Sequence, residues 1–302
     1  MRRNVEFPSK GLQCRGWLYV PEDLPDDRAA PAIVMGHGFS AVKEMFRLSS
    51  YAEKFEAAGF VTLVFDFRFL GASDGKPRGR ILSYEQCEDI RNAITWLSRQ
   101  PEVDGDRIGA WGTSYSGGHV LHLAAFDRRI RTVVAQVPTI DPVAQVVRRS
   151  GRDRFERVME MLAADRIRRF DGEPSRSIKV VAPEGELSAL GVTEAYEAMS
   201  RQATNAPSWV NSVTLESLED YIQYAPTAAI ELISPTPLLM VIAEQDLLIP
   251  ADLSKAAFDR AGAPKALHLE PCGHFEIYEK DPWFAQASDR MVEWFAMHLR
   301  DI

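Results

Sequence analysis

A serine within a run of small residues is the strongest chemical signal in the sequence. Ser114 stands in Gly112-Thr113-Ser114-Tyr115-Ser116-Gly117-Gly118, between an apolar run typical of a buried strand and a segment typical of a helix. On such a sharp strand-to-helix turn the backbone is strained, and the serine hydroxyl is exposed above the edge of a sheet. Ser116 replaces the second glycine of the G-x-S-x-G pattern, and its small size predicts only a local adjustment. Ser114 is therefore the predicted nucleophile.

A nucleophilic serine needs a general base, because a free hydroxyl is barely ionised at neutral pH. Among the six histidines, His274 lies after the last predicted strand and before the final predicted helix, in Pro271-Cys272-Gly273-His274-Phe275. We predict that His274 is the base. His37, in Gly36-His37-Gly38, is interpreted as shaping a loop beside the serine. The other four are interpreted as packing or surface residues: His119, His122, His268 and His298.

The base in turn needs a carboxylate that fixes its tautomer and stabilises the imidazolium. Asp246 directly follows an apolar run at residues 238–245, with Glu244 on the run itself. It is therefore placed at the carboxyl end of a predicted strand, where open α/β sheets build their sites. Asp246 is the predicted acid. Asp141, which follows the run at residues 132–138, stays open as the alternative acid.

Two backbone N–H groups are predicted to stabilise the oxyanion that forms when a serine attacks a carbonyl. The first belongs to Tyr115, directly after the nucleophile, where the start of a helix favours negative charge. The second belongs to Phe39, in the His37-Gly38-Phe39 loop that follows a strand-like run. Each such donor contributes on the order of 3 kcal/mol to the transition state.

Alternating strand-like and helix-like segments predict how these residues are brought together. The central strand-like segments are continuous apolar runs, and strand–helix alternation is typical of a parallel, doubly wound sheet. Two short segments at the N-terminus predict an antiparallel hairpin. The expected fold class is therefore α/β, with a mostly parallel eight-stranded sheet. The predicted strands are residues 5–7, 12–20, 31–38, 60–67, 107–114, 132–138, 238–246 and 266–271, and the predicted helices are residues 46–58, 83–99, 117–126, 253–261 and 282–299.

Residues 141–234 interrupt this alternation, because they are helix-like and poor in strands. This pattern predicts a core domain of residues 1–140 and 235–302, with a helical lid inserted at residues 141–234. Apolar residues of the lid could exclude water from the site. One arginine-rich stretch of the lid is interpreted as a solvated helix face rather than an anion site. It contains Arg148, Arg149, Arg152, Arg154 and Arg157.

Composition argues against several other classes of protein. The formal net charge of −8 is unfavourable for a protein that follows a nucleic-acid backbone. No apolar run is long enough to span a bilayer, and three widely separated cysteines favour reduced thiols in the cytoplasm. The sequence has no zinc-binding spacing and no phosphate-binding glycine motif, so no metal and no cofactor are expected. Asp66-Phe67-Arg68 and the glycines at residues 71–79 are interpreted as a structural turn beside the site.

With these motifs the chain resembles the α/β-hydrolase superfamily over nearly its whole length, including the order serine, aspartate, histidine. The turn around Ser114 is similar to that of the thiohydrolase and polyketide-transferase-like group, with kinship to dienelactone-hydrolase and S15-peptidase-like esterases. The resemblance implies ester, thioester or lactone substrates, a helical lid and no metal. Asp66-Phe67-Arg68-Phe69-Leu70-Gly71 departs from the commoner D-x-R-G-x-G form, which affects the pocket wall and leaves the triad intact. Further matching motifs are Gly36-His37-Gly38-Phe39, Gly71-Ala72-Ser73-Asp74-Gly75, Asp246 with Pro250, and Gly273-His274-Phe275.

The expected function is hydrolysis of an ester, thioester or lactone through an acyl-enzyme on Ser114. The expected partner is a small-molecule acyl substrate, with no nucleic acid and no membrane, and a homodimer is left open. One alternative is an acyltransferase or cyclase that uses the same triad. Another is a binding protein that keeps the fold without catalysis, because fold does not impose function.

Overall fold

One twisted sheet of eight strands organises the chain in the computed structural model, which describes residues 1–25 and 27–300. The strands are β1 (Arg2–Ser9), β2 (Leu12–Tyr19), β3 (Ala30–Gly36), β4 (Val61–Phe65), β5 (Val103–Thr113), β6 (Ile130–Gln136), β9 (Leu238–Ala243) and β10 (Lys265–Glu270). Their order in the sheet is β1-β2-β4-β3-β5-β6-β9-β10. Both pairings of β2, with β1 and with β4, are antiparallel, and the remaining pairings are parallel. The predicted fold class is therefore confirmed.

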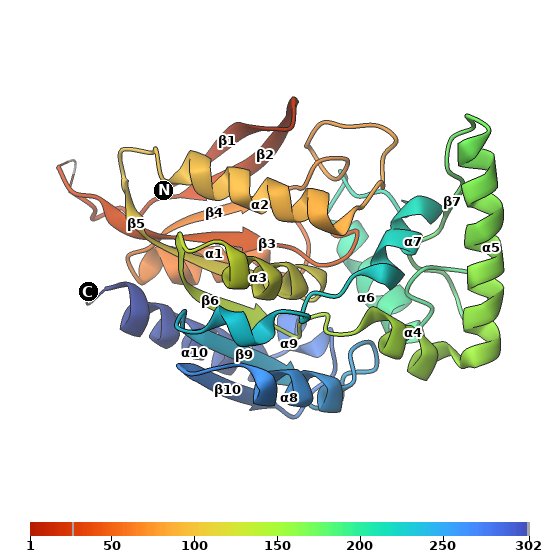
Figure 1. Ribbon diagram of the computed structural model, residues 1–302. Helices are drawn as coiled ribbons and strands as arrows, with labels where there is room; N and C mark the ends of the chain where they lie inside the picture. Colours follow the sequence, from red (N-terminus) through yellow and green to blue (C-terminus); the bar gives the residue numbers. More distant parts are fainter. Residues whose placement is uncertain (26, 301–302) are drawn as a thin grey trace.

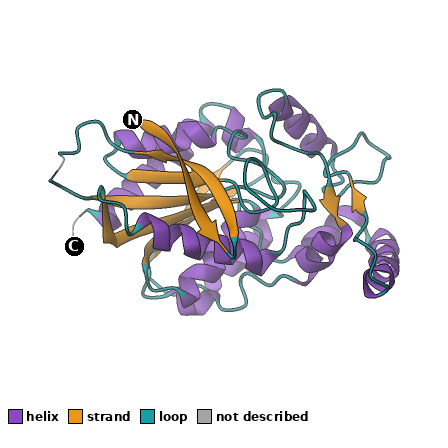
Figure 2. Cartoon of the chain, turned by 90° about the horizontal axis from the view of Figure 1, so that it is seen from above, coloured by secondary structure: helices purple, strands orange, loops and turns teal. Residues whose placement is uncertain are grey.

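Helices cover both faces of the sheet, as Figure 2 shows from above. α1 (Leu48–Ala57) and α10 (Trp283–Leu299) pack together over one face. α2 (Ser83–Leu97), α3 (Tyr115–Phe126) and α8 (Ala251–Arg260) lie over the other. Because both faces are covered, every residue of β3 and β9 is buried, and these strands appear in the sequence as unbroken apolar runs.

Four of the five predicted helices begin one or two residues from the predicted position, and backbone conformation explains two of these differences. The helix predicted from residue 46 begins at Leu48, because Phe46 and Arg47 have φ of 55° and 53°. These left-handed values cannot continue into a right-handed helix. The helix predicted from residue 117 begins at Tyr115, because Ser114 alone, with φ of 53° and ψ of −115°, turns the chain from strand to helix.

Most of the chain between β6 and β9 gathers at the end of the sheet toward which the parallel strands point, while residues 230–233 run back beside α3 (Figure 1). Both termini lie at the opposite end. This segment is mostly helical, as expected, although it also contains two-residue strands that pair with each other. Its division from the core as a lid stays a prediction, and residues 301–302 of the predicted core range lie outside the described residues. The elements are α4 (Pro142–Ser150), α5 (Arg152–Phe170), β7 (Ser177–Ile178), α6 (Thr193–Ala203), β8 (Val213–Thr214), α7 (Leu215–Gln223) and the 3₁₀ helix η1 (Ile230–Ile233).

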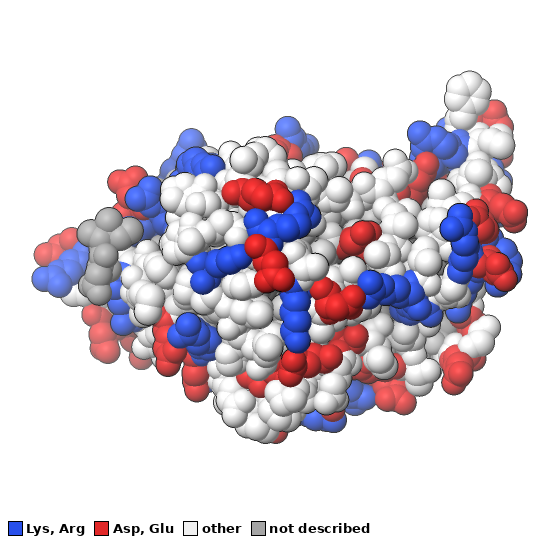
Figure 3. All heavy atoms as spheres, turned by 60° about the horizontal axis from the view of Figure 1, so that its bottom comes forward, with Lys and Arg blue, Asp and Glu red and all other residues white. Residues whose placement is uncertain are grey.

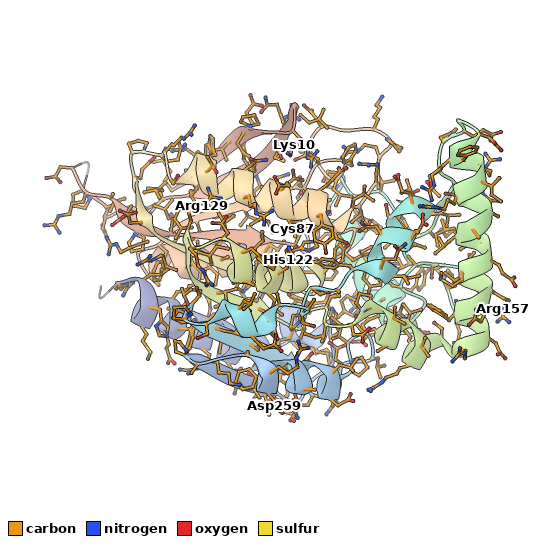
Figure 4. The ribbon with its side chains drawn as sticks, in the orientation of Figure 1. Lys10, Cys87, His122, Arg129, Arg157 and Asp259 are labelled. Atoms are coloured by element: carbon orange, nitrogen blue, oxygen red, sulfur yellow. The ribbon has the colours of Figure 1, made fainter. Side chains whose placement is uncertain are left out.

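The arginine-rich stretch does not form a single solvated face, so that interpretation is wrong for part of it. Arg152 and Arg157 are exposed, and Figure 4 shows Arg157 on the outer side of α5, pointing away from the molecule. Arg149 and Arg154 are half-buried and line a cavity beneath the helices. The cause is the break between α4 and α5 at Gly151, which prevents these arginines from sharing one helical face.

The surface charge, the helices and the cysteines have the properties that the composition predicts. Basic and acidic side chains are interspersed over the face shown in Figure 3. Within residues 1–25 and 27–300, no helix is long and apolar enough to cross a membrane. Cys14, Cys87 and Cys272 are buried and free, and burial raises the pKa of each thiol, so all three are held in the neutral form.

The Asp66 carboxylate ties the end of β4 to the loop before α1. One oxygen accepts the N–H of Lys43 at 2.7 Å, and the other accepts the Lys43 ammonium at 2.7 Å and the N–H of Ala72 at 2.8 Å. Asp66 is fully buried. A Cβ at Gly71, where φ is 51°, would lie 2.2 Å from Asp66 Oδ2, so only glycine fits this turn. These contacts agree with the interpretation of the segment as a structural turn.

Asp66→Asn is expected to lower the free energy of unfolding by about 3 kcal/mol, because the buried Lys43 ammonium would lose its fully buried counterion and keep only the partly exposed Glu44 carboxylate at 2.9 Å. Urea unfolding at pH 7 measures this loss. Glu293→Gln is the matched control, since its carboxylate pairs with Arg290 at 3.1 Å on the surface, where such pairs contribute little. Equal unfolding midpoints for the two variants would contradict the anchoring role of Asp66.

Candidate active site

Ser114 sits in a strained turn that its neighbours hold from both sides. Its N–H donates to the carbonyl of Gln136 at 2.9 Å, and its carbonyl accepts the N–H of Thr139 at 2.8 Å. A φ of 53° is uncommon for a residue with a side chain and costs energy that the surrounding structure must supply. A Cβ at Gly112 would lie 2.1 Å from the carbonyl oxygen of Ser116, so the close approach of β5 and α3 requires glycine there.

Ser116 shows how the turn accommodates a serine in place of glycine. Its side chain is fully buried, and its hydroxyl donates a hydrogen bond to the carbonyl of His37. A Cβ at Gly36 would lie 2.8 Å from the Ser116 Cβ, so the two chains touch. The predicted local adjustment therefore takes the form of a bond that ties the turn to the loop after β3.

Three predicted site residues form one hydrogen-bonded chain. His274 Nε2 lies 3.2 Å from Ser114 Oγ, and His274 Nδ1 lies 2.6 Å from Asp246 Oδ2. His274 is 2% exposed and Asp246 is 8% exposed, while Ser114 is half-buried. All three follow strands of the parallel part of the sheet, at its carboxyl edge. The structure therefore brings together residues that are 28 and 160 positions apart in the sequence.

The position of the Asp246 carboxylate is fixed by the loop that follows it. Its second oxygen, Oδ1, accepts the N–H of Leu248 at 2.8 Å and the N–H of Ile249 at 2.7 Å. Asp141, the alternative acid, is exposed and caps α4 instead, where it accepts the N–H of Ala144 at 2.9 Å. The geometry thus places Asp246, and not Asp141, beside the histidine.

The two predicted oxyanion donors come from the start of α3 and from the loop after β3. Tyr115 is the first residue of α3, so its N–H has no partner within the helix. Within the described part of the chain, the N–H of Phe39 also makes no hydrogen bond. The loop approaches closely, because a Cβ at Gly38 would lie 3.2 Å from the Ser114 Cβ. The Phe39 and Tyr115 rings pack edge to face at 5.4 Å.

Ser114 and His274 line an apolar cavity that contains about 450 Å³ of empty space, counting the solvent at its open side. The core contributes its floor, and the segment between β6 and β9 contributes Leu190 and Met199. Such a wall can bind an acyl chain and keep bulk water away from the serine. Other apolar lining residues are Phe46, Leu248, Phe275 and Tyr278.

The other histidines do not join this chain of hydrogen bonds. His37 is buried beside the serine turn, and its Nδ1 lies 3.0 Å from the carbonyl oxygen of Gly38, as expected of a loop-shaping residue. His268 pairs with Glu270 at 2.6 Å. Burial lowers the pKa of His37, His122 and His298, so each favours the neutral form.

His119 is a buried neutral histidine that makes stability depend on pH. Its ring nitrogens lie 3.0 Å from the Tyr224 hydroxyl and 3.0 Å from Gln86 Oε1. Burial, with smaller contributions from His122 and His37, lowers the His119 pKa from 6.5 to about 3. Between these two values the unfolded chain binds a proton that the native protein does not. The His119 contribution to stability is therefore complete above pH 6.5 and is lost as pH falls toward 3.

His119→Gln is expected to remove this loss, because glutamine does not titrate. Below pH 6.5 the free energy of unfolding of the wild type should fall by up to about 1.4 kcal/mol per pH unit through this group. The variant should lack that component, so the stability difference between the two proteins should narrow on acidification. Urea unfolding at pH 7, 6, 5 and 4 measures it. Parallel pH profiles would contradict a neutral His119.

Glu194 is a residue near the site that the sequence did not reveal. It lies at the start of α6, and its Oε1 accepts the N–H of Phe275 at 3.4 Å, next to His274. Burial raises the pKa of the Glu194 carboxyl, and the N–H of Phe275 and His274 partly offset this effect. No sequence signal marked it, because its approach depends on how a distant helix packs against the core. Among the described residues, no group of three His, Cys, Asp or Glu side chains could hold a metal ion.

Comparisons with known proteins place this geometry in a family. The family model described as X-Pro dipeptidyl-peptidase (S15 family) matches residues 11–276. The chain belongs to the S15 family of α/β-hydrolases. The expected membership of the α/β-hydrolase superfamily is thereby confirmed, and the chain is a hydrolase of the S15 and esterase type.

Proteins similar to this chain include enzymes of two named kinds. A thiohydrolase from Eupenicillium brefeldianum is 33% identical over 283 residues, which cover 91% of this chain and 88% of that protein. The polyketide transferase ATR5 from Stachybotrys chlorohalonatus is 34% identical over 280 residues, 90% of each chain. The crystal structure of the α/β hydrolase GrgF from Penicillium sp. sh18 superposes with a TM-score of 0.84 at 28% identity, over 99% of each chain. The expected kinship with thiohydrolases and polyketide transferases is thus confirmed.

Proposed function

We propose that this protein is a serine hydrolase that cleaves a carboxylic ester, thioester or lactone through an acyl-enzyme intermediate on Ser114. The single observation that carries the proposal is the hydrogen-bonded chain from Ser114 through His274 to Asp246, at the mouth of an apolar cavity. A nucleophile bonded to a base that is itself oriented by a carboxylate is the arrangement that activates a serine. Membership of a hydrolase family supports the same conclusion.

The mechanism follows from the positions of these groups. His274 Nε2 takes the proton of Ser114 as its oxygen attacks the substrate carbonyl, and Asp246 stabilises the imidazolium. The N–H groups of Phe39 and Tyr115 bind the oxyanion, which carries more charge than the ground-state carbonyl. His274 then protonates the leaving group, and water repeats the sequence on the acyl-enzyme. The free acid is released and Ser114 is regenerated.

The proposed substrate is a small acyl compound that enters beneath residues 141–234, acting as a lid. Leu190 and Met199 from this segment line the same cavity as Ser114, so closing the segment over the substrate would exclude water. The proposed compartment is the cytoplasm, which the three free and buried cysteines favour.

Acyl transfer is a second candidate, because the same acyl-enzyme can pass its acyl group to an alcohol or amine instead of water. The apolar wall around Ser114 favours an organic acceptor over bulk water. ATR5, 34% identical to this chain, is named a polyketide transferase. The two candidates share every step up to the acyl-enzyme and differ only in the acceptor.

A fluorophosphonate probe and a series of p-nitrophenyl esters test the proposal together. We expect covalent labelling at Ser114, located by mass spectrometry, together with turnover of short- or medium-chain esters. An added alcohol that increases p-nitrophenol release and yields a new ester would identify a transferase. A protein that neither reacts with the probe nor cleaves any ester would be a binding protein with the same fold.

A further inference from the structure

A second cavity lies beneath the helices of residues 141–234 and contains about 510 Å³ of empty space, counting the solvent at its open side. Most of its wall is apolar, with Val146, Val158, Met161, Leu218 and Ile222 among the lining residues. Two arginines, Arg149 at the end of α4 and Arg154 in α5, line the same space. A simple packing defect would be lined by apolar side chains alone. The two cationic side chains in this wall favour an anionic ligand.

Neither guanidinium is neutralised by the protein. Among the described residues, no carboxylate lies within 4.0 Å of Arg149 or Arg154, and the buried Nε of Arg149 has no hydrogen-bond partner. Most other arginines of the same segment are paired, for example Arg148 with Asp252 and Arg169 with Asp165, while the unpaired Arg157 is exposed to solvent. Both side chains are half-buried, and an unpaired guanidinium in such a place is stabilised by an anion that supplies the missing acceptor.

This second cavity adjoins the catalytic one. Leu190 lines the cavity around Ser114, while its neighbours Ala189 and Gly191 line the second cavity. Tyr221, in the wall of the second cavity, packs its ring against Phe39 at 5.4 Å and against Tyr115 at 5.5 Å. The two cavities share no lining residue, and the Tyr221 ring stands between them, so a substrate that reaches from Ser114 to the arginines must displace this ring.

We propose that Arg149 and Arg154 bind an anionic group of the substrate, a carboxylate or a phosphate, while its reacting carbonyl lies at Ser114. The proposal rests on the proposed acyl-transfer function and adds the class of substrate. The planar guanidinium matches carboxylate and phosphate oxygens in pairs, and the hydroxyls of Ser150 and Ser188 in the same wall supply further donors. The apolar wall holds the hydrocarbon between the two ends.

The anion has two chemical sources that share this recognition. It is either a carboxylate at the far end of the acyl chain or a phosphate in the leaving group. Two matched pairs of substrates separate them. The first pair is the p-nitrophenyl half-ester of suberic acid and its neutral methyl ester, and the second is octanoyl-coenzyme A and octanoyl-pantetheine, which lacks the phosphates.

The wild type should prefer the anionic member of at least one pair by about 10- to 100-fold in kcat/KM, the range expected of charge-assisted hydrogen bonds. The double variant Arg149→Gln/Arg154→Gln should lose this preference while cleaving the neutral substrates within about threefold of the wild-type rate. Arg157→Gln is the matched control, because Arg157 is exposed on the outer side of α5, the helix that carries Arg154 (Figure 4), and it should keep the preference. Arg149→Lys, which keeps the charge and loses the paired geometry, should give an intermediate preference.

A preference for suberate alone assigns the site to the acyl chain, and a preference for octanoyl-coenzyme A alone assigns it to the leaving group. Equal kcat/KM values within both substrate pairs, or a preference for the anionic substrate that persists in the double variant, would overturn the anion site. Either result would leave the hydrolase proposal unaffected. If no substrate is cleaved and Ser114 is not labelled, the hydrolase proposal has failed instead. The cavity is then judged by thermal stabilisation with suberate and with inorganic phosphate. Stabilisation that the double variant lacks supports an anion site, and its absence in the wild type overturns one.

Discussion

Ser114→Ala should lower kcat for an activated ester by about 10⁴- to 10⁶-fold, because the variant has no nucleophile to form the acyl-enzyme. The residual rate would come from the oxyanion donors and substrate binding alone. The melting temperature should stay close to that of the wild type, since the Ser114 backbone makes both hydrogen bonds that hold the turn. Steady-state kinetics with p-nitrophenyl esters and a thermal melt measure the two quantities.

Ser200→Ala is a suitable control for this experiment. Ser200 lies exposed on α6, so its hydroxyl has no part in the site and its removal should leave turnover unchanged. A Ser114→Ala protein that cleaves esters at the wild-type rate would eliminate the acyl-enzyme mechanism. A variant that fails to fold would trace the loss to the strained turn, and Ser114→Cys, with similar shape and a reactive thiol, then tests the nucleophile.

The core of the fold was predictable from sequence because its physics is local. Strands covered on both faces, such as β3 and β9, must be apolar at every position, and this leaves an unmistakable run. Parallel strands place their carboxyl ends at one edge, so Ser114, Asp246 and His274 could be expected to meet without any knowledge of distances. The order serine, aspartate, histidine along the chain and the glycines around Ser114 indicated which chemistry these residues carry out.

The rest could not be predicted, because it depends on packing between distant segments. Glu194 approaches His274 only because α6 docks on the core, and Arg149 turns inward only because the chain breaks at Gly151. α5 is charged on all sides, so its sequence does not reveal which face is covered. The backbone conformation of Phe46 and Arg47 left no mark in the sequence either, since neither is a glycine.

Asp246→Asn should lower kcat by about 10⁴-fold while leaving the protein folded. The N–H groups of Leu248 and Ile249 both point at Oδ1, so the amide oxygen of the variant must stay there. Its NH₂ group then faces His274 Nδ1 and forces the proton of the neutral imidazole onto Nε2. A histidine in that tautomer cannot accept the proton of Ser114, and kcat with an activated ester measures the effect.

Asp141→Asn tests the alternative acid in the same assay. Asparagine caps helices as well as aspartate does, so the hydrogen bond to the N–H of Ala144 should persist and α4 should stay intact. Because Asp141 makes no contact with His274 among the described residues, turnover should remain within about threefold of the wild type. The ratio of the loss of kcat in Asp246→Asn to the loss in Asp141→Asn decides which aspartate is the acid. A large loss in Asp141→Asn with a small one in Asp246→Asn would mean that the acid reaches His274 from the end of β6, through a rearrangement of α4.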